Sequence, residues 1–183
     1  MALWITIGVI VIVLAWFVAT YNKLVGAKNA ADNSWADIDV QLKRRYDLIP
    51  NMVESVKGYA MHEKSIFENV AAARSAAMNA KTPAEHAAAE NMLSTTLKSL
   101  FAVAENYPEL KASENFMRLQ SELRDAEDKI EAARRFYNAN VRDWNTLIQS
   151  FPTNVIASLL KFTARQFFET TGDAERQAPK VSF

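Results

Sequence analysis

The first 22 residues, MALWITIGVIVIVLAWFVATYN, contain no charged side chain, and this stretch limits the possible folds more than any other feature of the chain. An α-helix rises about 1.5 Å per residue, so about 20 apolar residues cross a hydrocarbon core of about 30 Å. Trp4 lies near one end of the stretch, and Trp16 and Tyr21 lie near the other, where aromatic side chains favour the membrane–water interface. We therefore predict a transmembrane anchor over residues 1–22.

Two alternatives explain this stretch less well. A buried β-strand would suit the β-branched run VIVIV, but the apolar stretch is much longer than an ordinary strand. A cleaved signal peptide would need a basic n-region and a clear cleavage site. Residues 1–3 contain no basic side chain, and no clear cleavage site precedes Tyr21. Lys23 and Lys28 follow the span, so the positive-inside rule favours a cytoplasmic C-terminal body. Because two lysines are few, the opposite orientation stays open.

Composition excludes several classes of function. The 183 residues include 21 basic and 21 acidic side chains, a balance that argues against binding to nucleic acid. The absence of cysteine excludes a disulfide and a thiolate nucleophile. Four glycines and five prolines in an alanine-rich chain favour helices over sheets. We therefore expect an all-α body with a core of its own.

A long apolar stripe follows the span, and its positions recur every three or four residues, as on one face of a helix. They are Trp35, Ile38, Leu42, Tyr46, Ile49, Val53, Val56 and Ala60. Pro50 lacks the N–H group that would bond the carbonyl of Tyr46, so either the helix kinks there or a new helix begins with Asp47 as its N-cap. The stripe keeps its phase across Pro50, which favours the kink. Gly26 is a second point where the helix could bend.

Three consecutive cations, Lys43, Arg44 and Arg45, lie between two residues of this stripe, Leu42 and Tyr46. Lys43 and Arg44 point to the polar side, and Arg45 flanks the apolar positions. We interpret the run as a solvated helix face. A binding patch for anionic lipid or for a partner protein is the alternative.

Three further helices follow from the pattern. The second starts near Glu63 and has the apolar positions Ile66, Val70, Ala73 and Ala77. The third starts at the capping box of Thr82 and Glu85, with Pro83 at its first position, has Ala89, Leu93, Leu97 and Leu100 on its apolar face, and ends near Glu105. The fourth follows Ser113. Its apolar positions are Phe116, Leu119, Leu123, Ala126, Ile130, Ala133, Tyr137, Val141, Trp144, Ile148 and Phe151. A stripe of this length predicts packing in an antiparallel, coiled-coil-like bundle over residues 23–151.

The chain after Pro152 is predicted to form a short apolar helix over residues 152–170, with Asn154 as a candidate cap. Its apolar side chains cover too much of its circumference for an ordinary amphipathic helix. The helix could pack on the bundle, lie on the membrane or contact another subunit. Residues 171–183 are expected to form an irregular tail.

Residues that could support catalysis are scarce. His62 and Glu63 begin like a zinc-protease helix, but Ile66 stands where the second histidine is needed. A di-iron bundle needs a glutamate three residues before each histidine, whereas Tyr59 and Pro83 hold those positions before His62 and His86. Paired carboxylates such as Glu122 and Asp125 fall on polar positions between stripe residues. We expect no catalytic residue, no metal ligand and no cofactor, and so no enzyme.

The chain resembles the LemA family of bacterial membrane proteins. The resemblance rests on Tyr21-Asn22 with Leu24-Val25, on Ser34-Trp35 through Tyr59 with the run IDVQLKRRYDLIPN, on Asn115-Phe116, LQSEL and AARR, and on Tyr137-Asn138 and Phe151-Pro152-Thr153-Asn154. It implies a single-pass protein of the bacterial cytoplasmic (inner) membrane, with an α-helical body and a poorly defined molecular role. It also implies membrane metallopeptidases or TPM-type proteins as candidate partners and brings no catalytic residues.

The leading functional hypothesis is a membrane-anchored helical scaffold that acts by homo-oligomeric assembly. Its expected partners are the lipid bilayer and other copies of the chain, and neither nucleic acid nor a small-molecule substrate is expected. One alternative is an adaptor for a membrane metallopeptidase or another membrane protein, with Lys43, Arg44 and the outer face of the fourth helix as its contact surface. Another is a membrane-remodelling protein that acts through its last helix.

Overall fold

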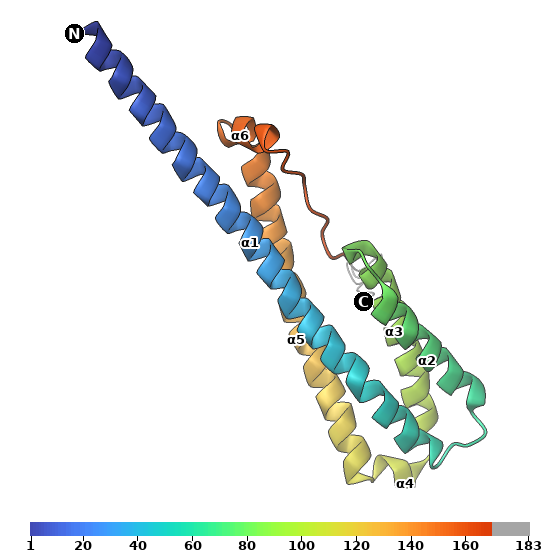
Figure 1. The fold of residues 1–183 in the computed structure, drawn as a ribbon. Helices are drawn as coiled ribbons and strands as arrows, with labels where there is room; N and C mark the ends of the chain where they lie inside the picture. The colour runs from blue at the N-terminus through green and yellow to red at the C-terminus, as the bar shows by residue number, and fades with distance from the viewer. Residues whose placement is uncertain (170–183) are drawn as a thin grey trace, which may run out of the picture. The chain divides into compact units, whose positions relative to one another are not determined.

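The computed structural model describes residues 1–169, and this part of the chain is helical with no β-strand (Figure 1). Its helices are α1 (Ala2–Lys57), α2 (Lys64–Asn79), α3 (Pro83–Ala104), α4 (Pro108–Lys111), α5 (Glu114–Gln149) and α6 (Thr153–Leu159). The all-α class with long helices is therefore confirmed. The single turn α4 was not anticipated; it lies between the end of α3 and the start of α5. The tail predicted over residues 171–183 lies outside the described residues.

The described residues form two compact units. Unit 1 consists of Met1–Asp39 and Glu131–Phe167. Unit 2 consists of Val40–Ile130, followed by residues 168 and 169. Helices α1 and α5 each contribute one part to each unit.

Helix α1 is continuous from Ala2 to Lys57, and neither Gly26 nor Pro50 ends it. The alternative in which a new helix starts at Asp47 is therefore wrong. The helix does end at Lys57, and turns over residues 58–63 lead to α2, which settles that the first two helices of the body are separate. The N-terminal part of α1 is long and apolar enough to cross a membrane, and its most apolar window buries no residue against the rest of the protein. These properties are compatible with membrane anchoring.

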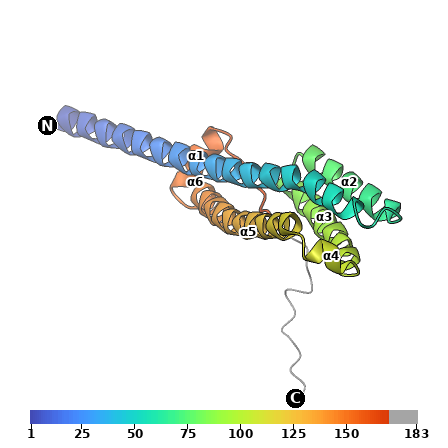
Figure 2. The same ribbon diagram turned by 90° about the horizontal axis from the view of Figure 1, so that it is seen from below.

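Unit 2 is built around the second part of α1, the antiparallel pair α2 and α3, and the first part of α5 (Figure 2). The expected apolar stripes form most of its core, with three shifts. On α1, Met52 is fully buried, whereas Val53 is only partly buried. Phe67 takes the buried place expected for Ile66, and Ala89 is only partly buried, whereas His86, Ala87 and Glu90 are buried on α3. The observed stripe of α3 therefore passes through a charged residue, which a search for apolar side chains skips.

The capping box at the start of α3 is confirmed. The Glu85 N–H donates to Thr82 Oγ1 at 3.2 Å, and the Glu85 carboxylate accepts from the backbone N–H groups of Lys81 and Thr82 at 2.8 and 3.3 Å. These N–H groups of Lys81 and Thr82 hold the pKa of Glu85 below its usual value. The capping contribution of Glu85 is therefore present above the usual pKa of a free glutamate and is lost as pH falls through the lowered pKa.

Replacing Thr82 by alanine removes the cap acceptor and should lower the free energy of unfolding by about 1 kcal/mol. Urea unfolding of the full-length protein in detergent, followed by circular dichroism, measures this change. Thr95→Ala is the matched control, because Thr95 is exposed in the interior of the same helix and its hydroxyl bonds only the carbonyl of Asn91. An equal effect of the two substitutions would contradict a stabilising role for the cap.

The last helix is much shorter than expected. Helix α6 ends at Leu159, and the N-cap position is held by Pro152 and not by Asn154. Lys161 adopts a left-handed conformation with φ 57°, and the N–H groups of Lys161 and Phe162 bond the carbonyls of Ser158 and Ala157 at 3.1 and 2.9 Å. This is the hydrogen-bond pattern of a Schellman motif, which closes a helix and turns the chain away from its axis.

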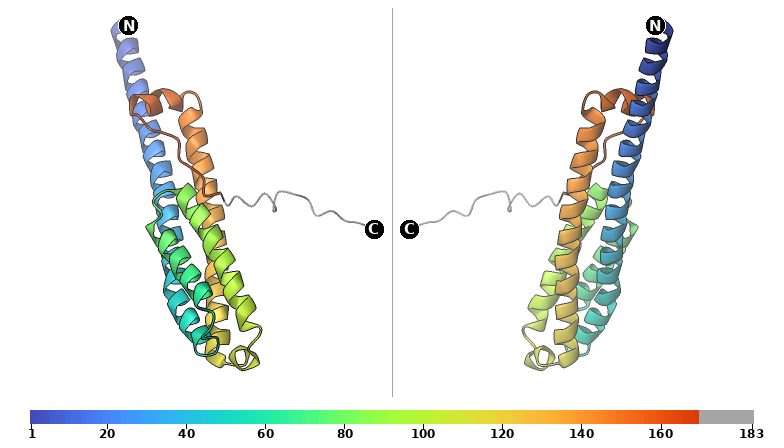
Figure 3. Two further views of the ribbon diagram at one scale, coloured as in Figure 1. Left: turned by 90° about the vertical axis from the view of Figure 1, so that its right-hand side faces the viewer. Right: turned by 90° about the vertical axis from the view of Figure 1, so that its left-hand side faces the viewer.

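Beyond this turn the chain is extended and runs back along unit 1 (Figure 3). We call residues 162–167 the strap. The helix predicted over 152–170 is therefore wrong beyond Leu159 within the described residues. The α5 stripe also ends earlier than expected, because Phe151 lies after the end of the helix and is 82% exposed.

Candidate functional site

Arg45, which the sequence placed beside the apolar stripe, lies in the core of unit 2. Its side chain is 4% exposed. The guanidinium donates to Glu90 Oε2 at 2.5 Å, to Glu127 Oε1 at 2.8 Å and to Ser94 Oγ at 3.0 Å. The interpretation of the whole cationic run as a solvated face is therefore wrong for Arg45. A buried guanidinium must be paired, and α3 and α5 supply its partners.

Glu90 is the centre of this cluster. One carboxylate oxygen accepts from Arg45, and the other accepts from the hydroxyl of Tyr46 at 2.6 Å. Adjacent residues of α1 therefore bond to the two oxygens of one buried carboxylate on α3. This arrangement fixes how α1 and α3 are aligned, because a shift of either helix by one turn would separate three buried polar groups.

Pro50 takes part in the same region through the backbone. It has no N–H to bond the carbonyl of Tyr46, and the Arg74 guanidinium donates to that carbonyl instead, from Nε at 2.7 Å. The proline in LIPN thus leaves an acceptor on α1 that an arginine of α2 satisfies. Arg45 and Tyr46 therefore bond to α3 directly, whereas Pro50 leaves a carbonyl of α1 free to accept from α2. All three residues help to hold α1 against a neighbouring helix.

The remaining cations of the run are at the surface. Lys43 is exposed, and Arg44, which is half-exposed, lies 3.4 Å from Asp125. A hydrogen bond from Lys129 is the main cause that lowers the pKa of the Asp125 carboxyl, and the charge of Arg44 acts in the same direction. Pairs as exposed as these contribute little to stability.

A hollow of 220 Å³ lies beside the buried cluster, with Ser94 and Glu127 in its wall. Lys98 and Arg124 also line it, so both signs of charge border the opening. Of the two histidines, His62 is exposed, and His86 is buried on α3 one turn before Glu90. Within residues 1–169, no three His, Asp or Glu side chains are arranged to hold a metal ion.

In unit 1, the C-terminal part of α5 holds the strap through side-chain bonds to backbone groups. Tyr137 donates to the carbonyl of Gln166 and Trp144 to that of Thr163, each at 3.0 Å. Asn145 forms a reciprocal pair with the backbone of Arg165, at 3.0 and 2.8 Å. These bonds satisfy an extended segment that has no β partner, and they explain why three polar or aromatic side chains recur on one face of α5.

Tyr137 and Arg165 also link the strap region to α1. The ring of Tyr137 packs edge-on against Trp35 at 5.2 Å between centroids, and Arg165 forms an ion pair with Asp32 at 2.6 Å. Burial raises the pKa of Tyr137; the positive charge of Arg165 opposes this effect, and the negative charge of Asp32 adds to it. The Tyr137 hydroxyl is therefore kept in its neutral, hydrogen-bond-donating form.

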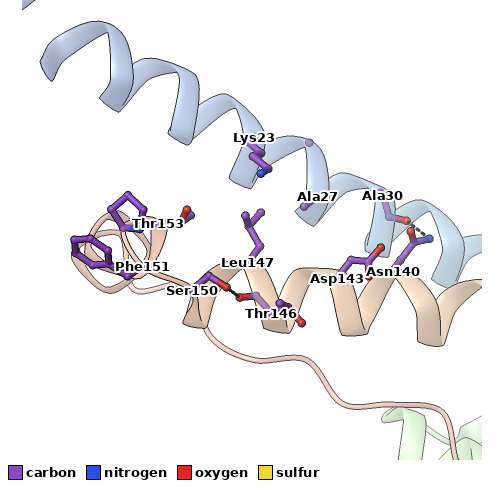
Figure 4. A pocket seen from close by; sticks show the side chains of 12 residues that line it. Lys23, Ala27, Ala30, Asn140, Asp143, Thr146, Leu147, Ser150, Phe151 and Thr153 are labelled. Atoms are coloured by element: carbon purple, nitrogen blue, oxygen red, sulfur yellow. Dashed lines mark hydrogen bonds between the residues drawn. The ribbon is translucent and has the colours of Figure 1, made fainter. Parts of the chain in front are cut away.

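A larger hollow, of 900 Å³, lies in unit 1 between the stretch of α1 just after the apolar span and the end of α5 (Figure 4). Lys23 and Ala27 border it from α1, and Asp143 and Leu147 border it from α5. The Asn140 amide donates to the carbonyl of Ala30 at 3.5 Å at one end of the hollow. Its wall combines one cation and one anion with amide and hydroxyl side chains, among them Asn140 and Thr146, and with small or apolar side chains.

The sequence contained a signal for the buried cluster that apolar periodicity could not detect. Glu90 lies four residues after His86 and three before Leu93, so it falls on the face of α3 that later faces the core. Arg45 directly precedes a stripe residue of α1. A charged residue in phase with an apolar stripe indicates a buried ion pair, and neither metal-binding nor catalytic motifs contain this pattern.

Comparison with known proteins gives consistent results. The LemA family model matches residues 34–183. The chain is 30% identical to the Protein LemA of Metamycoplasma hominis, over 85% of this chain and 70% of that protein. It is 23% identical to the magnetosome protein MamQ of Magnetospirillum gryphiswaldense, over 96% of this chain and 76% of that protein. Magnetosome protein MamQ 2 of Paramagnetospirillum magneticum is also 23% identical, over 94% and 74% of the two chains.

The family model covers most of the helical body, including the stretch with Arg45, Tyr46 and Pro50 and the part of α5 that binds the strap. The extent of this match and the identity to a LemA protein lead to one conclusion: this chain belongs to the LemA family.

Proposed function

We propose that this protein is a membrane-anchored helical scaffold that acts by assembling with copies of itself at the bilayer. The main support is helix α1, which begins with the uncharged, exposed apolar stretch and then continues as one helix as far as Lys57. A helix that spans the membrane and then contributes to the core of the body attaches that body to the bilayer without a flexible linker. The buried cluster of Arg45, Tyr46 and Glu90 has the properties of a packing element and not of a reaction centre.

A surface on unit 2 supports the self-assembly part of the proposal. A shallow hollow of 380 Å³ lies where α2 meets α3, and its lining consists of Ala76, Asn79, Ala80, Glu85, Ala88, Ala89 and Met92. We call this surface the alanine face. Met92 is 57% exposed, and Met78 nearby in the α2 sequence is 52% exposed. Small side chains permit close approach of another helix, and methionine adapts its shape to a partner.

Sizing of the full-length protein in detergent by light scattering, at micromolar concentration, tests the proposal. The expected result is an oligomer that Ala88→Arg on the alanine face converts to smaller species. Ser99→Arg is the matched control, because Ser99 is exposed on the same helix and does not line the hollow. A wild-type protein that is strictly monomeric under these conditions would rule out self-assembly.

The second candidate is an adaptor for another membrane protein, such as a membrane metallopeptidase. It is supported by Lys43, which is exposed, and by Arg44, which is half-exposed beside Asp125. Photocrosslinkers at Lys43 and Arg44 in cells should then capture one dominant foreign protein. Recovery of self-adducts alone would reject the adaptor and favour the scaffold.

For the location, we propose the bacterial inner membrane with the body in the cytoplasm, on the basis of Lys23 and Lys28 after the span. Two reporters fused after Phe183 separate the orientations, one that is active only in the cytoplasm and one that is active only outside it. Activity of the outside reporter alone would reverse the proposed orientation.

A further inference from the structure

Helix α6, together with Phe151, which precedes the N-cap residue Pro152, presents an apolar stripe that the described protein leaves uncovered. Phe151, Val155 and Leu159 follow one another at steps of four and are 82%, 57% and 70% exposed. On the opposite side, Ile156 and Ala157 are each 2% exposed. The buried side is thus fully used for packing in unit 1, and a second, equally apolar side remains open.

The contacts on the buried side of α6 show beside which part of α1 this helix lies. Ile156 and Ala157 form a cluster with Leu24 and Trp144, and Phe17 and Phe162 pack against that cluster. Phe17 lies within the uncharged stretch, and Leu24 lies just beyond it. Seven residues of helix separate these two contacts by about 10 Å, comparable with the interfacial layer of about 5–8 Å on each side of the hydrocarbon core. Helix α6 therefore lies beside the C-terminal end of the uncharged stretch of α1.

The charged residues around the stripe are also those expected at the end of a membrane span. Residues 150–164 contain no acidic side chain, and their single charged residue is Lys161, at the left-handed turn that ends α6. Lys23 of α1 lines the 900 Å³ hollow together with Phe151 and Thr153. Lysines beside an apolar stripe, at the end of a span, extend toward lipid headgroups and the aqueous phase. The acidic side chain in the lining of this hollow, Asp143, belongs to α5 and not to residues 150–164.

We propose that the exposed stripe of α6 is inserted into the interfacial layer of the same bilayer that α1 crosses. This inference rests on the proposed membrane anchor. The occupant is lipid because α6 packs beside Phe17 and Leu24, at the end of the uncharged stretch of α1, and the apolar side chains of that stretch are themselves exposed. The protein is then held at two places, by a spanning helix and by a short helix lying at the surface, so α1 cannot rotate freely about its own axis.

Single-cysteine variants test this placement, because the chain has no cysteine and one substitution gives one label. The full-length variants Val11→Cys, Leu159→Cys and Phe136→Cys are labelled with an environment-sensitive fluorophore and reconstituted into vesicles of phosphatidylcholine and phosphatidylglycerol. Phe136 is the matched control, because it is a 60% exposed apolar residue of unit 1 on α5. Circular dichroism verifies that each variant keeps the helix content of the wild type.

The label at Leu159 should emit at shorter wavelength than the label at Phe136, lose intensity when brominated lipid is included, and resist quenching by aqueous iodide. The label at Val11 should lose intensity with brominated lipid as well. If Val11 responds and Leu159 is quenched by iodide, the stripe faces water and the inference is overturned. If Leu159 is protected from both quenchers, another protein surface covers it, and the inference is again overturned. If Val11 itself does not respond to brominated lipid, the membrane anchor fails.

Discussion

Glu90→Gln is expected to lower the free energy of unfolding by about 3 kcal/mol. The substitution preserves the size of the side chain, but it leaves the guanidinium of Arg45 in the core with Glu127 as its only anionic partner among the contacts described. The hydroxyl of Tyr46 also loses a charged acceptor at 2.6 Å. Urea unfolding of the full-length protein in detergent, followed by circular dichroism, measures the change.

Two further variants make this prediction specific. Glu127→Gln removes the other carboxylate, but Glu127 is 50% exposed and water replaces part of its interaction, so a loss below about 1 kcal/mol is expected. Combining Arg45→Met with Glu90→Leu removes both buried charges and should recover most of the stability lost in Glu90→Gln. Equal losses for Glu90→Gln and Glu127→Gln would show that burial of the pair does not determine its contribution.

Trp144→Ala is expected to destabilise unit 1 by about 3–5 kcal/mol, because it empties a large volume in the cluster with Leu24 and Ile156. The substitution also removes the hydrogen bond to the carbonyl of Thr163 and the edge-on contact with Phe162 at 5.3 Å. Hydrogen exchange of the full-length protein in detergent, read out by mass spectrometry, should show faster exchange in residues 153–167.

Trp144→Phe is the control for this prediction, since it keeps an aromatic ring in the cluster and loses the indole N–H. A loss of about 1 kcal/mol is expected, for one hydrogen bond, together with faster exchange confined to the strap. If Trp144→Ala left exchange in residues 153–167 unchanged, the strap and α6 would not depend on this tryptophan, contrary to the contacts described.

The helices were predictable wherever the sequence gives a local signal. The capping box at Thr82 and the apolar period of α5 depend on residues three or four apart, and both were found from spacing alone. The continuity of α1 through Pro50 was also predictable, because the stripe keeps its phase. The interaction that compensates for the proline was not predictable from local sequence. Arg74 supplies it by donating to the carbonyl of Tyr46, and these two residues are 28 positions apart.

The end of α6 shows a different limit. Residues 155–168 consist mainly of helix-compatible side chains, and no glycine marks the turn at Lys161. The chain turns there because Phe162 packs against Trp144 and the strap finds hydrogen-bond donors on α5, which are tertiary interactions that override local helix propensity. The buried pair of Arg45 and Glu90 escaped prediction for a related reason, since each residue alone looks like surface charge.

The central claim is that the N-terminal apolar helix holds the helical body at a bilayer, and alkaline carbonate extraction of membranes from cells that produce the full-length protein tests it most directly. Mass spectrometry of the membrane fraction determines whether residues 1–22 remain attached. We predict that the intact polypeptide stays with the membranes after carbonate and is released only by detergent. Recovery of the intact polypeptide in the carbonate supernatant, or of a membrane-free form that begins after the apolar stretch, would contradict the account.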